Sequence, residues 1–538
     1  MQHGIGPIDY AIIGIYFVFV IGVGVLLKKR MVSSEDFFLA GHRIPSWVTG
    51  LAFLSANLGA IEVMGMAANA AQYGIMTAHF YWLGAIPAMV FLAIFMMPFY
   101  YGSKVRSVPE YLKMRFNEPT RALNAISFAV MTVLMSGINL YAMALVFQLL
   151  LGWDMTASIF VSAAVVLAYT ALGGLTSSIY NEVLQFFLIV FGLLPVSIIG
   201  LIQFDGWNGL VSKFKDPGFA HLWLQAGTAA NPMGVDWIGL VSGLGFVLSF
   251  GYWCTDFLVI QRALAAEDLP AAQRTPLIAA FPKVLFPLLT VFPGLLALVI
   301  IPGLGSNSTT LRWDMALPLM LMKYYPTGML GIGLTAMLAS FMSGMAGNVT
   351  AFNTVWTYDL YQSYIAKDKT DSHYLWMGRV ATAVGILISI GTAYLCMGFP
   401  SIMDYMQLIF SFFNAPLFAT FLLGMFWKRA SPWGAFWGLV LGTLTSAIHF
   451  YFTNIGTIHF TSVMAGNFWR STIAWSVCFV ATIAISMLTK PKPESELIGL
   501  CWGTTLNPEP VVLSWYKNPK VLGVIVLILT VICNIYFW

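Results

Sequence analysis

The sequence predicts an all-α integral membrane protein with about fourteen transmembrane helices. Of its 538 residues, 59% are hydrophobic and only 9% are charged, which leaves too little polar surface to cover the core of a water-soluble globule. Apolar runs of roughly 20 residues, the length that crosses a bilayer as one helix, recur along the whole chain. We therefore expect residues 1–538 to form a single transmembrane unit.

The predicted spans follow one another with mostly short connections. The first run has neither the basic start nor the small-residue cleavage site of a signal peptide, so we expect it to remain as a span. In chain order the spans are 9–28, 47–70, 79–101, 122–150, 155–172, 179–203, 236–261, 276–301, 327–358, 376–397, 402–426, 432–453, 471–489 and 520–538.

The distribution of basic residues predicts the orientation. Most of the 26 Lys and Arg, including Lys28, Arg43, Arg115 and Lys428, fall in loops that share one side if the N-terminus is outside. Because basic loops stay cytoplasmic, both termini are expected outside a cell membrane, either plasma or inner membrane. The net charge of +4 is spread over these loops, so the lipid bilayer suffices as its partner and no nucleic acid is expected.

Two glycine-interrupted spans indicate an internal repeat. The first, 47–70, carries Asn57 and Glu62 beside glycines, and five spans later 239–257 is again rich in glycine and polar side chains. Two discontinuous helices at matching positions are typical of a 5+5 inverted repeat with a binding site near the bilayer midplane. The alternative is that the glycines only permit close helix packing. The first repeat, the second repeat and the two peripheral segments would then be 47–203, 236–426, 1–30 and 427–538.

Ionisable residues within the spans are candidates for function, because an unpaired charge in hydrocarbon is costly. Glu62 is the first candidate, since Asn57 and flanking glycines surround it. Lys283 stands between two prolines, where it would either face a polar chamber or cap carbonyls that the prolines leave free. Glu182 and Asp404 are the other ionisable groups predicted well inside the spans.

The span 327–358 offers oxygen ligands for a cation. It contains LTAMLASFMSGMAGNVTAFNT, with Ser340, Ser343, Thr350 and Asn353. Hard monovalent cations need several oxygen ligands, which hydroxyls facing an unwound backbone can supply. The alternative is that Ser and Gly mediate helix packing here, and sequence spacing leaves both possibilities open.

Five segments carry motifs of a known family. They are EDFFLAGHRIPSW at 35–47, SVPEYLKMRF at 107–116, ALGGLTSSIYNEVLQ at 171–185, GYWCTDFLVIQRALAA at 251–266 and FLLGMFWKRASPWGAFWGL at 421–439. Together they resemble the sodium/solute symporter family, and within it the sodium–glucose cotransporter branch. The resemblance implies fourteen helices around a five-plus-five inverted repeat, a sodium ion as the coupling ion and a small-molecule solute as partner.

The resemblance also implies where sodium binds. In the cotransporter branch, backbone carbonyls of the first broken helix and oxygens of a later span hold the ion. The matching positions here are Ser55, Leu58, Ser340 and Ser343. The family usually has a second adjacent serine where this chain has Gly344, so one hydroxyl ligand is lost. Glu182 stands where the family often has an aspartate linked to a second cation site.

Sugar contacts of the branch map onto Asn57, Glu62, Tyr81, Tyr252, Trp253, Lys283 and Gln407, and Ser249 stands where some members carry an asparagine. Position 62 is usually an amide or imidazole and position 81 a glutamate, so the carboxylate has moved between helices. Carboxylate, amide and ammonium groups all pair with the hydroxyls of a sugar or polyol, and aromatic faces suit its apolar face. An amine-bearing solute is the chemical alternative, since a carboxylate can pair with it directly.

These patterns favour a sodium-coupled symporter that imports a small polar solute, most simply a sugar or polyol, by alternating access. An intramembrane enzyme is disfavoured, because the sequence has no metal-ligand cluster, nucleophile motif or phosphate-binding loop. A transporter-like sensor or channel would keep the fold and lose coupled transport. The sequence is compatible with a monomer or a homodimer.

Overall fold

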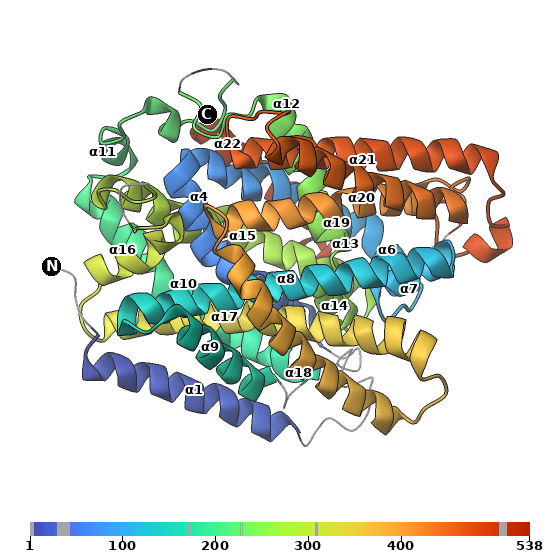
Figure 1. Ribbon diagram of the computed structural model, residues 1–538, viewed down its shortest axis with the longest axis horizontal. Coiled ribbons are helices and arrows are strands. Elements are labelled where there is room, and N and C mark those ends of the chain that lie inside the picture. Colours follow the sequence, from blue (N-terminus) through green and yellow to red (C-terminus); the bar gives the residue numbers. More distant parts are fainter. Residues whose placement is uncertain are drawn as a thin grey trace.

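A computed structural model describes residues 5–28, 44–170, 174–225, 228, 230–306, 310–504 and 514–538. Within these ranges the regular structure is helical, and the one isolated β-bridge joins Ile44 to Ala266. Figure 1 shows the long helices lying side by side and running across the view, as expected for a membrane-spanning bundle. The prediction of an all-α protein is confirmed.

Long α-helices alternate with segments of 3₁₀- or π-helix, which carry the label η. In the described ranges they are α1 (Pro7–Lys28), α3 (Ser46–Asn57), η2 (Ile61–Gly65), α4 (Met66–Tyr73), η3 (Gly74–Ala78), η4 (Phe80–Ala85), α5 (Ile86–Phe91), η5 (Leu92–Met96), α6 (Met97–Gly102), α7 (Val108–Arg115), α8 (Glu118–Leu151), α9 (Met155–Thr170), α10 (Gly174–Gln203), α11 (Trp207–Val211), η6 (Pro217–Ala220), α12 (Trp237–Gly239), η7 (Leu240–Leu248), α13 (Ser249–Thr255), α14 (Phe257–Leu264), α15 (Leu269–Ile300), η8 (Trp313–Met315), α16 (Ala316–Tyr324), α17 (Met329–Thr354), η9 (Val355–Ile365), α18 (Asp371–Cys396), α19 (Ile402–Phe426), α20 (Pro432–Asn454), α21 (Val463–Leu488), η10 (Glu494–Leu497), η11 (Trp515–Lys517) and α22 (Pro519–Tyr536).

Eleven helices of the described chain are long and apolar enough to cross a membrane, and the bent pair Ser46–Asn57 and Ile61–Ala78 makes a twelfth. Pro7–Val20 and Met155–Ala168 are shorter apolar helices. Each of these helices lies where the sequence predicts a span. The total of fourteen spans and the inverted repeat stay predictions.

The first predicted interruption is present between α3 and η2. The helix ends at Asn57, and Leu58 adopts a non-helical conformation with φ −73° and ψ 46°. The segments before and after the break are bent by 62° relative to each other. A helix end leaves backbone carbonyl and amide groups without helical partners, so this bend exposes polar backbone within the bundle.

The second interruption lies at Asp256 and not at the glycines of 239–257. η7 and α13 continue through Gly243 and Gly251, and Asp256 is an extended residue whose carboxylate accepts a bond from the Leu258 amide at 2.9 Å. The glycines serve close packing instead. A Cβ on Gly243 would lie 2.6 Å from the Cβ of Phe468, and a Cβ on Gly251 would lie 2.9 Å from the carbonyl oxygen of Asn414.

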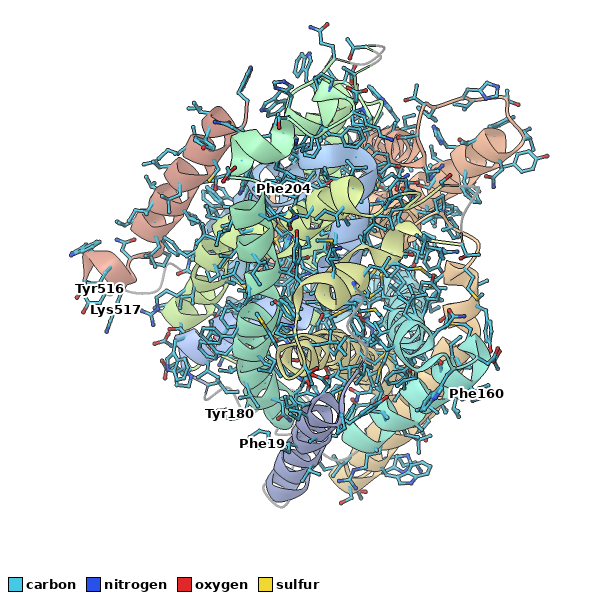
Figure 2. The ribbon with its side chains drawn as sticks, turned by 90° about the vertical axis from the view of Figure 1, so that its left-hand side faces the viewer. Phe19, Phe160, Tyr180, Phe204, Tyr516 and Lys517 are labelled. Carbon is cyan, nitrogen blue, oxygen red and sulfur yellow. The ribbon has the colours of Figure 1, made fainter. Side chains whose placement is uncertain are left out.

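The periphery of the bundle is apolar. Figure 2 shows Phe19, Phe160 and Tyr180 on the outside of the molecule, where 51%, 55% and 48% of these residues are exposed. Large exposed apolar side chains on a helical perimeter fit contact with lipid.

The start of α1 lies beside the start of α17, where the Gly328 and Gly331 amides donate to Asp9, and the Phe537 carbonyl near the C-terminus accepts from the Leu222 amide. Both places lie in the left half of Figure 1, the C-terminus at its upper edge. This placement agrees with an even number of membrane crossings. Residues 29–43, with several of the basic residues used to predict orientation, lie outside the described ranges.

Close packing of α15 on α4 helps to position the first broken helix. A Cβ on Gly294 would lie 2.0 Å from the carbonyl oxygen of Ala67 and 2.8 Å from its carbon. Because both are backbone atoms, the contact cannot be relieved by rotating a side chain. α4 follows η2 directly, so α15 supports the segment that carries Glu62.

We predict that Gly294→Ala separates α15 from α4 and lowers stability by about 1–3 kcal/mol, the range typical of overpacked interiors. The measurement is the thermal unfolding midpoint of the purified protein in detergent. Gly14→Ala is the matched control, because nothing lies within 4 Å of a Cβ at that position. Equal midpoints for the two variants would contradict this account of the packing.

Candidate solute and cation site

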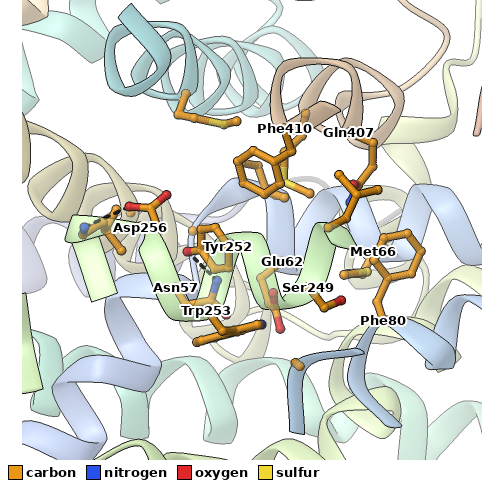
Figure 3. Close-up of a pocket in the computed structure, with 18 of the residues that line it drawn as sticks. Asn57, Glu62, Met66, Phe80, Ser249, Tyr252, Trp253, Asp256, Gln407 and Phe410 are labelled. Carbon is orange, nitrogen blue, oxygen red and sulfur yellow. Dashed lines mark hydrogen bonds between the residues drawn. The ribbon is translucent and has the colours of Figure 1, made fainter. Parts of the chain in front are cut away.

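A cavity lies between the two interrupted helices, with α8, α15 and α19 around it (Figure 3). The eight side chains that the sequence assigns to solute contact all line it. They are Asn57, Glu62, Tyr81, Ser249, Tyr252, Trp253, Lys283 and Gln407. The structure therefore brings together residues from distant parts of the chain, while their contact with a solute stays a prediction.

A buried ion pair forms the polar centre of this cavity. The Lys283 ammonium lies 2.6 Å from Glu62 Oε1 and donates a second bond of 2.6 Å to Asn57 Oδ1. Asn57 Nδ2 in turn donates to the Tyr252 hydroxyl at 2.9 Å, as Figure 3 shows. Lys283 thus faces the chamber, and its ammonium bonds to side chains of the first broken helix.

Aromatic rings surround the Lys283 ammonium. The ring centroids of Trp253, Tyr81 and Phe286 lie 4.8, 5.2 and 5.3 Å from its nitrogen. Ring faces attract cations, so they offset part of the cost of removing this charge from water. The Tyr81 hydroxyl bonds to Thr290 at 2.7 Å, which fixes the ring in this position.

Gln407 and Ser249 add polar atoms to the same lining. The oxygen Gln407 Oε1 is buried and has no hydrogen-bond partner among the described residues. A buried acceptor left unpaired is unfavourable, so a ligand that donates an O–H or N–H to it would gain free energy. Ser249 packs against Gly84, where a Cβ would lie only 2.1 Å from its hydroxyl oxygen.

The four positions assigned to sodium converge at the break of the first helix. The Ser340 hydroxyl donates to the Leu58 carbonyl at 2.6 Å, and the Ser343 hydroxyl donates to the Ser55 carbonyl at 2.8 Å. The hydroxyl oxygens of Ser55 and Ser343 are 3.2 Å apart, and all four residues are fully buried. This cluster of carbonyl and hydroxyl oxygens matches the ligand chemistry of a hard monovalent cation.

Gly344 allows α17 to pack closely against the break of the first helix. A Cβ on Gly344 would lie 2.7 Å from Gly59 Cα and 2.8 Å from Asn139 Oδ1. α17 therefore reaches the helix break because both contact positions are glycine. Asn139 accepts a bond of 3.0 Å from the Ala60 amide, which the break would otherwise leave unpaired.

Glu182 is held by an arginine. Its carboxylate oxygens lie 2.6 and 3.3 Å from guanidinium nitrogens of Arg262, and the Ser178 hydroxyl donates to it at 2.7 Å. Neither charged side chain is exposed. A cation could use Glu182 only if Arg262 moved away, so the second cation site stays a prediction that this arrangement does not favour.

Several polar residues of the cavity were not anticipated from the sequence. Asn139, Asn348 and Asp256 line it together with Phe410, whose ring stacks on Tyr252 with centroids 5.1 Å apart and planes 22° from parallel. A lone amide in the apolar run 122–150 is a usable signal for Asn139, since polar side chains at that depth need a partner. Phe410 lies in a phenylalanine-rich stretch and carries no such signal.

Residues 37–442 match the sequence model of the sodium:solute symporter family. The chain belongs to this family. It is accordingly a multi-pass membrane protein of a transporter family whose coupling ion is sodium.

Curated relatives of this symporter extend over most of its length. The sodium/glucose cotransporter of Vibrio parahaemolyticus is 30% identical over 465 residues, covering 82% of this chain and 84% of the relative. Sodium/myo-inositol cotransporter 2 of Oryctolagus cuniculus is 28% identical over 94% of this chain and 80% of the relative. A solved Na⁺-coupled sialic acid symporter in a substrate-bound, outward-open state shares the fold, with a TM-score of 0.77 at 21% identity over 90% of this chain and 99% of that one.

We predict that Ser343→Ala in this symporter raises the sodium concentration for half-maximal uptake about fivefold, the equivalent of one lost bond of roughly 1 kcal/mol. The measurement is solute uptake into proteoliposomes against external sodium. Thr335→Val is the matched control on the same helix, because within the described part of the chain that hydroxyl bonds only to the Gly331 carbonyl one turn away. A sodium curve unchanged by Ser343→Ala would remove this serine from the ion site.

Proposed function

We propose that the protein is a sodium-coupled symporter that imports a small neutral polyhydroxylated solute, a sugar or polyol, by alternating access. The observation that carries the proposal is the Glu62–Lys283 pair, which lines the cavity next to the oxygen cluster of the helix break. Relatives named as glucose and myo-inositol cotransporters support the same class of solute.

A neutral solute suits the charge balance of the pocket. Glu62 and Lys283 already compensate each other, so a solute with a net charge would have to displace one partner or remain without a counter-charge. Hydroxyl groups can instead accept from the ammonium and donate to the carboxylate or to Gln407 Oε1 while the pair stays intact. The faces of Tyr252 and Trp253 offer apolar surface for the carbon side of a sugar ring.

Coupling follows from one helix break that serves both ligands. Ser55 and Leu58 provide carbonyl oxygens to the ion cluster, while Asn57 and Glu62 point into the solute cavity. A sodium ion bound at this break would restrict its motion, and it would therefore also hold the side chains of Asn57 and Glu62 in place. Such an ion shifts the conformational equilibrium only by the difference in its free energy of binding to the two states.

Alternating access requires a barrier on one side of the bound solute. The stacked rings of Tyr252 and Phe410 line the cavity and are suited to this role. We further propose fourteen spans with repeats at 47–203 and 236–426 and both termini outside the cell membrane. The common side of the two chain ends in Figure 1 supports this topology.

The test is uptake into proteoliposomes that carry the purified protein and an inward sodium gradient. We expect glucose or myo-inositol to accumulate above its external concentration with sodium and not with potassium. Flux without accumulation would indicate a channel, and binding without flux a sensor. Accumulation of an amine-bearing solute in preference to both polyols would assign Glu62 to cation recognition and overturn the proposed solute class.

We predict that Glu62→Gln weakens solute binding roughly 10- to 100-fold, because a charge-assisted hydrogen bond is worth about 1.5–3 kcal/mol. Half-saturating solute concentration and the amount of folded protein are measured together. Glu110→Gln is the control, since Glu110 bonds to the Arg106 amide outside the cavity. Unchanged uptake kinetics in Glu62→Gln would exclude this carboxylate from the site.

A further inference from the structure

Behind the solute cavity, a threonine that does not line it bonds to a tyrosine that does. The hydroxyls of Thr290 and Tyr81 lie 2.7 Å apart, and Thr290 is fully buried. Tyr81 belongs to the cavity lining, whereas Thr290 does not. Thr290 follows Lys283 by about two turns of α15, so one face of this helix carries both the ammonium of the ion pair and the partner of Tyr81. Thr290 can therefore influence a solute only through Tyr81.

The Tyr81 hydroxyl has one proton to donate and two acceptors within reach. One is the Thr290 hydroxyl, and the other is the Glu62 carboxylate. Glu62 also accepts from the Lys283 ammonium at 2.6 Å. A hydrogen bond to a carboxylate is charge-assisted and roughly twice as strong as one between neutral groups. The Tyr81 proton therefore prefers Glu62, provided that no other donor has taken the carboxylate.

The Thr290 hydroxyl also has a second acceptor, the Phe286 carbonyl one turn earlier on α15, at 3.1 Å. The two hydroxyl protons thus have two complete arrangements. In the first, Thr290 donates to Tyr81 and Tyr81 donates to Glu62. In the second, Tyr81 donates to Thr290 and Thr290 donates to the Phe286 carbonyl. Hydroxyl protons rotate freely about their C–O bonds, so the exchange uses both protons in each arrangement and moves no ring or backbone.

We propose that Thr290 is a positioning residue for solute recognition, which accepts the Tyr81 proton when a hydroxyl of the solute donates to Glu62. The inference rests on the proposed transport of a neutral polyhydroxylated solute. A hydroxyl of such a solute competes with Tyr81 for the carboxylate, and the displaced Tyr81 proton turns to Thr290. Because a buried donor left unpaired is unfavourable, this alternative acceptor makes the exchange less costly and solute binding tighter.

The competing explanation is that the Thr290 bond only fixes the Tyr81 ring, which lies 5.2 Å from the Lys283 nitrogen. The two explanations differ in the sign of one effect. If the bond only fixed the ring, loss of either hydroxyl would weaken solute binding. Under the proposal the two losses act in opposite directions, because Thr290→Val leaves the displaced Tyr81 proton without an acceptor, whereas Tyr81→Phe removes the competitor for Glu62.

The experiment measures the half-saturating solute concentration for uptake into proteoliposomes at saturating sodium, using whichever of glucose or myo-inositol the wild type accumulates. We expect Thr290→Val, which keeps the shape of threonine, to raise this concentration about tenfold, as an unpaired buried donor does. Thr290→Ser keeps the acceptor and should restore wild-type binding. Tyr81→Phe should bind the solute at least as tightly as the wild type, and adding Thr290→Val to it should change nothing further.

Thr530→Val is the matched control, because within the described part of the chain this buried hydroxyl bonds only to the Val526 carbonyl one turn earlier, and it does not line the cavity. Weaker solute binding by Tyr81→Phe would overturn the proposal and leave Thr290 a ring-fixing role, and wild-type binding by folded Thr290→Val would overturn it as well. If Thr290→Val does not fold, the Tyr81→Phe result decides alone. Failure of the proposed function looks different, since the wild type would then accumulate neither solute with sodium.

Discussion

The interruption of the first broken helix at Leu58 is the constraint on which the rest of the site depends. A broken helix inside an apolar bundle leaves backbone groups that must find partners, because no lipid atom can replace water as donor or acceptor. At the break, Ser340 and Ser343 donate to the carbonyls of Leu58 and Ser55, and Asn139 accepts from the Ala60 amide. The same break turns Asn57 and Glu62 toward Lys283. The proposed ion site and the proposed solute site therefore share one local break in the helix.

Charge balance is the second organising principle. Two buried carboxylates of the bundle are ion-paired: Glu62 with Lys283 and Glu182 with Arg262. A paired charge is tolerated at this depth, while breaking either pair would leave an uncompensated ion. The two pairs differ in access, because the first lines the solute cavity and the second has no exposed surface. Only the first can take part in recognition without a change in structure.

Periodicity and intramembrane polarity were enough to predict the helical architecture and the identity of the Glu62 segment. Glycine spacing alone misplaced the second interruption, because Gly243 and Gly251 allow close packing in a helix that runs on to Asp256. The sequence did not predict the pairing of Lys283 with Glu62 either. Backbone carbonyls that the neighbouring prolines leave free of hydrogen bonds were an equally good partner for a lysine. Phe410 was also missed, because nothing in a phenylalanine-rich stretch indicates which of its rings will stack on another aromatic side chain.

The bonds from Ser340 and Ser343 to the carbonyls of Leu58 and Ser55 have a consequence for the unloaded carrier. The two hydroxyl groups direct their protons at the carbonyl oxygens, so these buried acceptors are satisfied by the protein itself. In the proposed symporter, an ion that binds at this break replaces the two hydroxyl protons as the partner of the carbonyls, so binding is an exchange of partners and leaves no carbonyl unsatisfied.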